Sequence, residues 1–334
     1  MSGLFLGPLR PEDLLAVERE PVMAPDGAWF VASGHDAIRL LLRHQRLQPG
    51  ARVALPALIC PTVVSAICAE GLMPDFVDIE PDLCVMSFDE NVFARRGFDL
   101  ILLPHLYGLP HPRTREIRDF ARNAGIPLIH DAAQSYGVCL DGKPLVNLDQ
   151  GGVYSFGPGK ATTAATGALV YGLSREAACL WGLDRLARWD PEAHFFMRQR
   201  MGLPGRSPSW GWLVRRGLRG SRIQAQAGHR VMRNFSRIEA GRRANWEVLR
   251  QWLGTELMGT RNERCSYYKF VFKTPNPEWC PPPEWAVVPW RRVVRHPTAG
   301  DLPHYGNPNE TLIELSTERS LAEYRTLAAE QGRA

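Results

Sequence analysis

Two short apolar runs decide the fold of this chain: Leu100-Ile101-Leu102-Leu103-Pro104 and Pro127-Leu128-Ile129-His130-Asp131. Runs of this length, bounded by proline and polar residues, are typical of buried strands. Between them, residues 117–124 repeat apolar side chains at the spacing of a helix that packs on one face. A strand, a helix and a second strand in this order predict a βαβ unit with parallel strands.

The same pattern continues on both sides of this unit. Four further apolar runs lie at residues 52–56, 75–79, 153–156 and 168–171. A helical stretch at 37–42 comes before them, and a turn at 47–50 ends that helix. The six runs predict an α/β fold with a mostly parallel sheet flanked by helices. Because ligands bind at the carboxyl ends of strands in such sheets, functional residues are expected just after each run.

The second half of the chain has a different character. Residues 181–253 are rich in Arg and Trp, and only 235–253 keep the periodicity of one long helix. Beyond them the sequence predicts a strand at 266–272 and a final helix at 320–329. We therefore expect a large α/β domain over residues 1–254, with an Arg-rich insert at 181–240, and a smaller C-terminal α+β domain over 255–334.

The composition is that of an ordinary globular protein. The 334 residues are 45% hydrophobic and 22% charged, which excludes a disordered, collagen-like or disulfide-scaffold protein. The seven cysteines form no Cys-x-x-Cys pair, so reduced thiols and no metal site are expected. The N-terminus lacks the cationic start of a signal peptide, and no run of about 18 apolar residues occurs. These features predict a cytoplasmic protein that does not cross a membrane.

The net charge of +5 is unevenly distributed. Residues 181–250 hold fifteen arginines and five acids, about +10, so the rest of the chain sums to about −5. Four interpretations of this basic segment are open: a solvated face, a pocket for the pyrophosphate of a substrate, a contact between lobes or subunits, and a nucleic-acid surface. We favour a substrate or subunit contact over nucleic acid.

Two segments that follow predicted strands carry reactive side chains. In 130–135, His-Asp-Ala-Ala-Gln-Ser, Asp131 ends a strand; in 154–160, Lys160 ends a proline-glycine turn. Lysine is scarce in this chain and occurs only at positions 143, 160, 269 and 273. A lysine that loses its proton on burial can form a Schiff base, which arginine cannot. A carboxylate on a neighbouring strand can keep a pyridine nitrogen protonated, so the two residues predict a site for pyridoxal phosphate (PLP).

Several short motifs occur in a specific order: Ser-Gly-His-Asp-Ala at 33–37, Pro-Gly at 49–50, Val-Asp-Ile at 77–79, His-Leu-Tyr-Gly at 105–108, Asp-Ala-Ala-Gln at 131–134, the segment 155–160 and Ala-Gly-Arg-Arg-Ala-Asn at 240–245. With them the chain resembles the DegT/DnrJ/EryC1/StrS family of PLP-dependent sugar aminotransferases, as a short and divergent member. The resemblance is strong in the first half and weak in the second. It implies the aspartate-aminotransferase-like PLP fold type I and a homodimer.

The resemblance also implies a role for each residue that matches a family motif. Lys160 would be the catalytic lysine, which carries the cofactor and moves a proton once the substrate amine has released it. Asp131 would pair with the pyridine nitrogen, and Gln134 would lie beside the phenolic oxygen of the ring. The phosphate group would be held by Ser155 and by a helix start formed by Ser33, Gly34, His35 and Asp36.

The implied reaction is an amino transfer in two stages. An amino acid donor leaves its nitrogen on the cofactor, and a keto sugar linked to a nucleotide collects it. Two alternatives are open: a PLP protein of the same fold with other chemistry, such as a sugar dehydratase, and a non-catalytic regulatory or nucleic-acid-binding member.

The chain departs from the family pattern at three places. His35 stands where the family has Thr, so an imidazole replaces a hydroxyl near the phosphate or that contact is lost. No aromatic residue occurs at 58–61, where the family stacks a ring on the cofactor. The family segment that reaches across the dimer is not recognisable between residues 206 and 226. In the family this segment reaches toward the phosphate in the partner subunit, so all three differences concern the cofactor.

Overall fold

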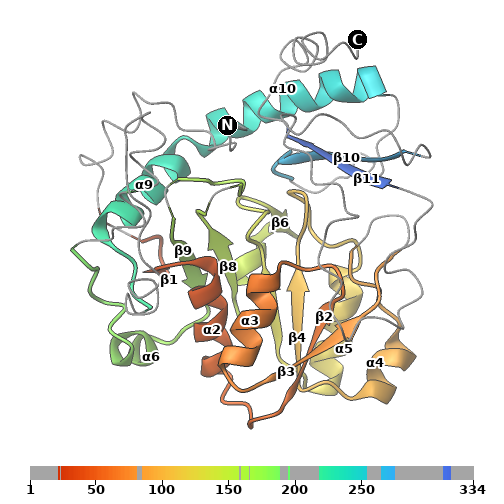
Figure 1. Cartoon of the computed structure of the whole chain (residues 1–334), viewed down its shortest axis with the longest axis vertical. Coiled ribbons are helices and arrows are strands. Elements are labelled where there is room, and N and C mark those ends of the chain that lie inside the picture. Colours follow the sequence, from red (N-terminus) through yellow and green to blue (C-terminus); the bar gives the residue numbers. More distant parts are fainter. Residues whose placement is uncertain are drawn as a thin grey trace.

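A computed structural model of the chain describes residues 22, 24–80, 85–157, 159–164, 166–188, 195, 218–253, 265–274 and 311–316. Its central sheet has seven strands: β1 (Ala28–Val31), β2 (Arg52–Pro56), β3 (Met73–Val77), β4 (Leu100–Pro104), β5 (Leu128–Asp131), β8 (Gly152–Ser155) and β9 (Ala168–Tyr171). They lie in the order β1-β9-β8-β5-β4-β2-β3 (Figure 1). Only β9 runs antiparallel to its neighbours in this sheet, which is therefore mostly parallel, as predicted.

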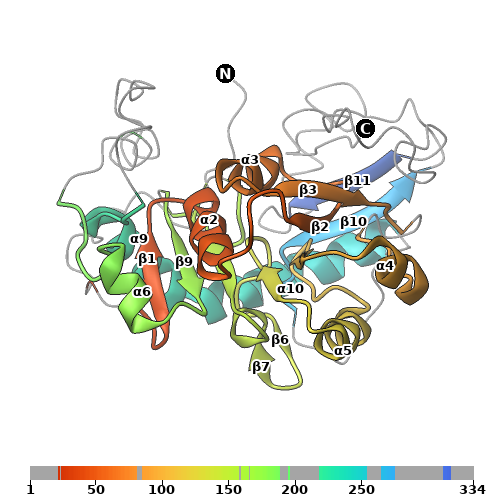
Figure 2. The same cartoon turned by 90° about the horizontal axis from the view of Figure 1, so that it is seen from below.

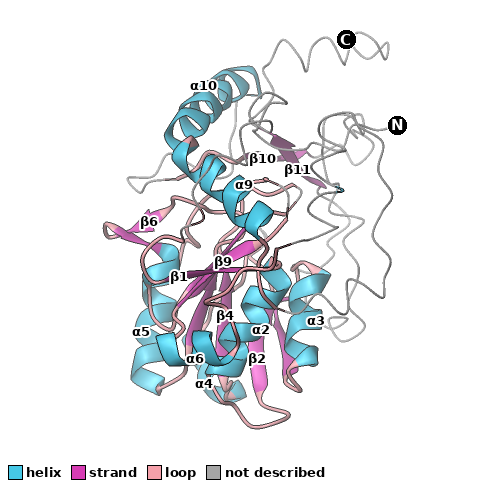
Figure 3. Ribbon diagram, turned by 90° about the vertical axis from the view of Figure 1, so that its left-hand side faces the viewer, coloured by secondary structure: helices cyan, strands magenta, loops and turns pink. Residues whose placement is uncertain are grey.

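Helices cover both faces of the sheet: α2 (Gly34–His44), α3 (Pro61–Ala69), α4 (Glu90–Arg96), α5 (Thr114–Ala124), α6 (Arg175–Leu180), α9 (Arg222–Arg233) and α10 (Phe235–Leu253). One apolar core joins α2, α3 and α6 to one face of the sheet. Two further cores join α4 and α5, and separately α9, to the opposite face. Figures 2 and 3 show α2 and α3 on one side of the strands and α5 on the other. This three-layer arrangement is the expected α/β fold.

The central strands are mostly apolar because both of their faces are covered. In β4, Leu100 and Leu102 pack under α2 and α3, whereas Ile101 and Leu103 pack under α4 and α5. Burying each such side chain stabilises the fold by about 1.5–3 kcal/mol. Polar residues are therefore confined to the ends of these strands, where the candidate site lies.

The bounds of α2 are fixed by local sequence signals. Ser33 is its N-cap, and the Ser33 hydroxyl oxygen accepts a hydrogen bond of 3.1 Å from the backbone N–H of Asp36. Arg43 and His44 in the last turn favour the negative end of the helix dipole. Gly50, with a φ of +82°, lies in the turn that follows, as the Pro-Gly pair predicts. The N-cap places the first turn of α2 at the carboxyl end of β1.

Most of the predicted strands are confirmed. The runs at 52–56, 100–104 and 168–171 match β2, β4 and β9 in both bounds. The run at 75–79 is displaced, since β3 pairs Met73 with Arg52 and Val77 with Pro56 of β2. The edge strand β1 was not predicted. It is an edge strand that pairs only with β9 in this sheet, and Trp29 is its one half-buried residue.

The expectation that only 235–253 is helical within the Arg-rich segment is wrong, because α9 precedes α10. The capping box of Ser221 and Gln224 starts α9. Its buried face consists of small or polar residues rather than large apolar ones: Gln224, Ala225, Gln226, Ala227, Gly228 and Val231. Part of the predicted insert thus belongs to the core that covers the sheet.

The remaining described strands are β10 (Lys269–Thr274) and β11 (Thr311–Ser316), which pair antiparallel, and a short pair, β6 (Cys139–Leu140) and β7 (Lys143–Pro144). Figure 1 shows β10, β11 and α10 beyond one end of the central sheet. The predicted boundary at 254 and the predicted helix at 320–329 lie outside the described residues. Across the described ranges, no helix has the length and hydropathy that a bilayer span requires.

Two buried histidines lie behind the site, on the face of β5 opposite to Asp131, and one of them contacts the more exposed Asp149. The His105 Nε2 and His130 Nδ1 atoms are 2.9 Å apart, and His130 Nε2 lies 2.8 Å from Asp149 Oδ2. Burial and the neighbouring histidines hold the pKa of His105 well below its ordinary value. Burial also lowers the pKa of His130, although Asp149 opposes the shift.

These histidines predict a loss of stability in mild acid. Below about pH 6.5 the unfolded chain takes up protons that the folded chain resists, so the free energy of unfolding falls as the pH falls. We expect a loss of roughly 1–2 kcal/mol between pH 7.5 and 5.5. Urea unfolding of wild type and His105→Gln across this range measures it, and the variant is expected to show a clearly smaller slope. Identical slopes would show that His105 does not resist protonation.

Candidate active site

A cavity of about 200 Å³ opens where the carboxyl ends of β5 and β8 meet the first turns of α2 and α3. It brings together side chains from distant parts of the sequence, as expected for a ligand site at the carboxyl edge of an α/β sheet. Its lining residues are Ser33, Gly34, His35, Ile38, Cys60, Thr62, Val63, Asp131, Ala133, Val153, Ser155, Gly157, Lys160, Thr166 and Gly167.

One wall of the cavity is suited to an anion. The first turn of α2 leaves backbone N–H groups without partners inside the helix, and the helix dipole favours negative charge there. Gly34 brings this turn against Ser155: a Cβ at Gly34 would lie 3.3 Å from the Ser155 hydroxyl oxygen. The hydroxyl of Ser155 accepts a hydrogen bond from Gly157 N–H, and within the described residues it donates none. It is therefore available to donate to a phosphate.

Asp131 forms the acidic part of the cavity. Its side chain is buried at the end of β5, and its Oδ1 accepts a 3.0 Å hydrogen bond from the backbone N–H of Ala133. Burial raises the pKa of Asp131, although the positive charge of Lys160 and the hydrogen bond from Ala133 oppose the shift. A cation in the cavity would therefore favour the ionised form of this carboxyl group.

Lys160 lies in a loop after β8 that is fixed by its own threonines. The backbone N–H of Lys160 donates to the Thr163 hydroxyl oxygen at 2.8 Å, and this hydroxyl lies 2.7 Å from the Lys160 carbonyl oxygen. The Thr162 hydroxyl donates to the Ser155 carbonyl oxygen at 2.8 Å. Because Ser155 ends β8, these bonds tie the lysine loop to the strand that carries it.

Two side chains from the second half of the chain also hold the lysine loop. The buried guanidinium group of Arg242, on α10, donates to the Ala161 carbonyl oxygen at 2.5 Å. The Tyr268 hydroxyl donates to the Gly159 carbonyl oxygen, and the Arg242 guanidinium lies 5.4 Å from the centre of the Tyr268 ring. The loop is thus fixed from two elements that follow it by about a hundred residues.

Replacing Arg242 with methionine is expected to lower the free energy of unfolding by about 2 kcal/mol, because it removes a buried charge-assisted hydrogen bond. Urea denaturation measures the change. Arg243→Met is the matched control: Arg243 is the next residue on α10 and is exposed, so a change within about 0.5 kcal/mol is expected. Equal losses in both variants would contradict a specific role for Arg242.

The structure gathers most of the predicted site residues but not all of them. Ser33, Gly34, His35, Asp131, Ser155 and Lys160 line the cavity, whereas Asp36 and Gln134 are not among its described lining residues. The Ser33 hydroxyl donates to Asp36 Oδ2 at 2.6 Å, so Asp36 supports the cap of α2. Gln134 Oε1 accepts the backbone N–H of Tyr107 at 3.0 Å, which joins the loops after β4 and β5.

Several lining residues were not singled out by the sequence as site residues. Thr166 and Gly167 precede β9, the antiparallel strand, so they reach the same edge from the amino end of their strand. The Thr166 hydroxyl oxygen accepts a 2.5 Å hydrogen bond from Gln224 of α9. The rule that functional residues follow strands misses them. Thr62 and Val63 lie in the first turn of α3, a helix that was not predicted.

The donor set of the cavity fits pyridoxal phosphate. An anion wall at α2 and Ser155, a buried carboxylate and a lysine match the phosphate, the pyridine nitrogen and the aldehyde of this cofactor. Ile38, Val63 and Val153 add apolar surface for a flat ring. Among the described residues, no cluster of three His, Cys, Asp or Glu side chains is present that would hold a metal ion.

Comparison with known proteins identifies relatives of this chain. The model of the DegT/DnrJ/EryC1/StrS aminotransferase family matches residues 26–273, more than half of the chain. A UDP-N-acetyl-3-dehydro-alpha-D-glucosamine 3-aminotransferase from Acidithiobacillus ferrooxidans is 32% identical over 135 residues, 40% of this chain and 36% of the relative. The chain covers between 31% and 45% of the length of three curated relatives that it matches.

Solved structures share the fold at low sequence identity. The aminotransferase TlmJ from Streptoalloteichus hindustanus superposes with a TM-score of 0.75 and 19% identity, over 99% of this chain and 98% of that one. An E. coli GDP-4-keto-6-deoxy-D-mannose-3-dehydratase with bound hydrated PLP gives a TM-score of 0.66 at 16% identity, over 90% and 86% of the two chains. The fold is therefore that of PLP-dependent enzymes with more than one chemistry.

Proposed function

Because the chain belongs to the DegT/DnrJ/EryC1/StrS aminotransferase family, we propose that it is a PLP-dependent aminotransferase. It moves an amino group from an amino acid donor to a keto sugar linked to a nucleotide. The observation that carries this proposal is the single cavity that unites Lys160, Asp131, Ser155 and the start of α2. These are the amine, acid and anion-binding groups that the cofactor requires.

Each of these groups has one task in the proposed reaction. Lys160 would hold the cofactor covalently, and its amine would carry a proton to and from the substrate carbon. Asp131 keeps a proton on the pyridine nitrogen, and Ser155 with the first turn of α2 holds the phosphate. Bound in this way, the cofactor withdraws electrons from the bonds of the carbon that bears the amino group. The threonine and arginine contacts of the lysine loop orient the amine.

The acceptor is proposed from the relatives and from charge. The relative from Acidithiobacillus ferrooxidans is named for a UDP-linked sugar. Residues 181–250 of this chain carry an excess of arginine, which suits the pyrophosphate of such a substrate. Arg215, Arg216, Trp210 and Trp212 of this segment lie outside the described residues. The homodimer implied by the family resemblance stays a prediction, as does the cytoplasmic location.

The proposal is tested by adding PLP to the purified protein and recording its visible absorption before and after borohydride reduction. A new band and a reduced adduct mapped to Lys160 are expected, and Lys160→Ala is expected to form neither. Glutamate and other amino acids are then added to the unreduced protein, and at least one should convert the cofactor to its aminated form. Nucleotide-linked keto sugars should reverse this change.

Each step has an outcome that contradicts the proposal. Without a band or an adduct that depends on Lys160, the chain does not use PLP, and the regulatory or nucleic-acid-binding alternative gains. If the adduct forms and a keto sugar loses a hydroxyl group without gaining nitrogen, the protein is a dehydratase, as in the E. coli enzyme with this fold.

A further inference from the structure

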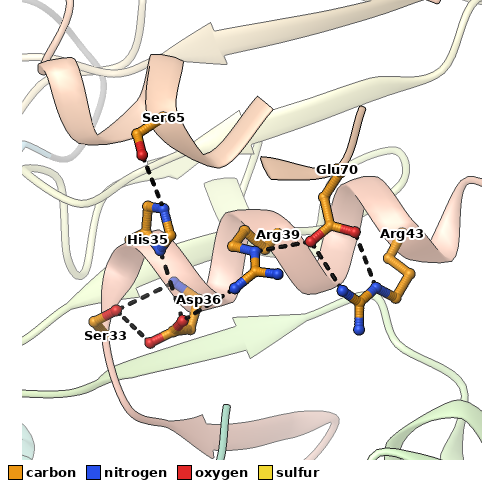
Figure 4. Close-up of polar contacts among 7 residues, drawn as sticks. All are labelled: Ser33, His35, Asp36, Arg39, Arg43, Ser65 and Glu70. Atoms are coloured by element: carbon orange, nitrogen blue, oxygen red, sulfur yellow. Dashed lines mark hydrogen bonds and ion pairs between the residues drawn. The ribbon is translucent and has the colours of Figure 1, made fainter. Parts of the chain in front are cut away.

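His35 places an imidazole ring at the anion wall of the cavity. It is the second residue of α2, its side chain is 28% exposed, and it lines the same cavity as Ser155. Figure 4 shows the ring between α2 and α3, with Nε2 at 3.5 Å from the Ser65 hydroxyl oxygen. Its Nδ1 lies 3.6 Å from Asp36 Oδ1. Both ring nitrogens are thus near polar partners at the start of the helix.

The ring is surrounded by groups of both signs. Asp36 on α2 places a negative charge beside the imidazole, and Arg39 places a positive charge 4.0 Å from Asp36. The other titratable groups that line this cavity are Cys60 at the start of α3, Asp131 at the end of β5 and Lys160 in the loop after β8. Asp36 is buried and is already bonded to Ser33, so its position beside the ring is fixed.

A second observation also indicates an anion at this wall. Ser155 is more than nine-tenths buried, faces the cavity and, within the described residues, donates no hydrogen bond. Gly34 brings the first turn of α2 against the Ser155 hydroxyl, and His35 of the same turn lines the same cavity. A dianionic group seated there favours the charged form of a neighbouring imidazole.

Given the proposed PLP chemistry, we propose that His35 is a proton-linked ligand of the cofactor phosphate. The imidazole takes up a proton when the phosphate binds and donates a charge-assisted hydrogen bond to it. A threonine at this position donates a hydrogen bond without titrating. The contribution of His35 to the affinity for PLP is therefore larger at pH 6 than at pH 8.5.

The test measures the dissociation constant of PLP at pH 6 and pH 8.5 in wild type and in His35→Thr. His35→Gln serves as a second variant that keeps a polar side chain of similar length. Every other proton-binding group is common to the three proteins and to PLP, so only the difference between proteins reports on His35. Between pH 6 and pH 8.5, we expect the affinity of wild type for PLP to fall about tenfold more than that of either variant. This factor corresponds to ~1.4 kcal/mol.

Two further ligands assign the effect to the phosphate. Pyridoxal, which lacks the phosphate, should show no difference between wild type and His35→Thr in its pH dependence. Sulfate, which keeps its double charge throughout this range, should compete with PLP more strongly at pH 6 than at pH 8.5 in wild type only. Binding is read by equilibrium dialysis, so no turnover is needed.

The outcomes separate this inference from the proposed function. If all three proteins form the PLP adduct at Lys160 with the same pH dependence of affinity, the role of His35 is refuted and the PLP function stands. A variant that binds PLP more weakly by the same factor at every pH also refutes it, since that is a loss of contact without a proton. If wild type forms no adduct, the proposed function itself fails.

Discussion

Lys160→Ala is expected to lower the rate of amino transfer by about a thousandfold to ten-thousandfold. The variant loses the amine that binds the cofactor and also the general base that moves the proton, and the second role alone contributes about 10²–10⁴. The lysine loop should keep its shape, because its hydrogen bonds run through the backbone of Lys160 and the hydroxyls of Thr162 and Thr163. The loss is therefore chemical, and steady-state kinetics at saturating donor and acceptor measures it.

Lys143 provides the matched control. It is an exposed lysine on β7, so Lys143→Ala removes the same side chain without touching the cavity, and unchanged kinetics are expected. Added methylamine should restore part of the activity of Lys160→Ala, since a small free amine can move the proton in place of the missing one. Retention of full activity in Lys160→Ala, or an equal loss in Lys143→Ala, would exclude Lys160 as the catalytic lysine.

The first half of the fold could be predicted because its signals are local. β2, β4 and β9 are short runs of apolar residues buried on both faces, and their sequences need no tertiary information to be recognised. The edge strand β1 was missed. α9 was missed because its burial depends on tertiary contacts. α9 is buried through alanine, glycine and glutamine, which fit a close approach to Phe156 and Thr166 that only the folded chain reveals.

The residues of the candidate site also differ in whether the sequence alone indicates their role. Lys160 and Asp131 were found from the sequence because scarce or charged residues at strand ends are conspicuous. Arg242 was named only within a weak motif, and nothing in the sequence indicates that its guanidinium group reaches the lysine loop. That contact joins residues 81 positions apart and depends on how α10 packs. Asp36 and Gln134 match family motifs, yet their side chains bond to Ser33 and Tyr107 and support the site from outside the cavity.

Asp131→Asn is expected to change stability and activity in opposite directions. Burial raises the pKa of Asp131, so its negative charge is a cost to the folded protein without cofactor. Asparagine keeps the size of the side chain and an oxygen for the N–H of Ala133, and the free energy of unfolding should stay equal or rise by up to about 1 kcal/mol. Amino transfer should nevertheless fall by about a hundredfold to a thousandfold, because the neutral amide cannot hold a proton on the pyridine nitrogen.

Asp149→Asn is the control, with the opposite effect on stability and little effect on activity. Burial would raise the pKa of Asp149, but hydrogen bonds from His130 and Arg118 outweigh it and lower the pKa, so this charge stabilises the fold. Its removal should lower the free energy of unfolding by about 1–2 kcal/mol and leave amino transfer nearly unchanged. Urea unfolding and steady-state kinetics on both variants complete the comparison. If Asp131→Asn were the less stable variant and retained activity, Asp131 would be a structural residue, and the cavity would have no acid for the cofactor.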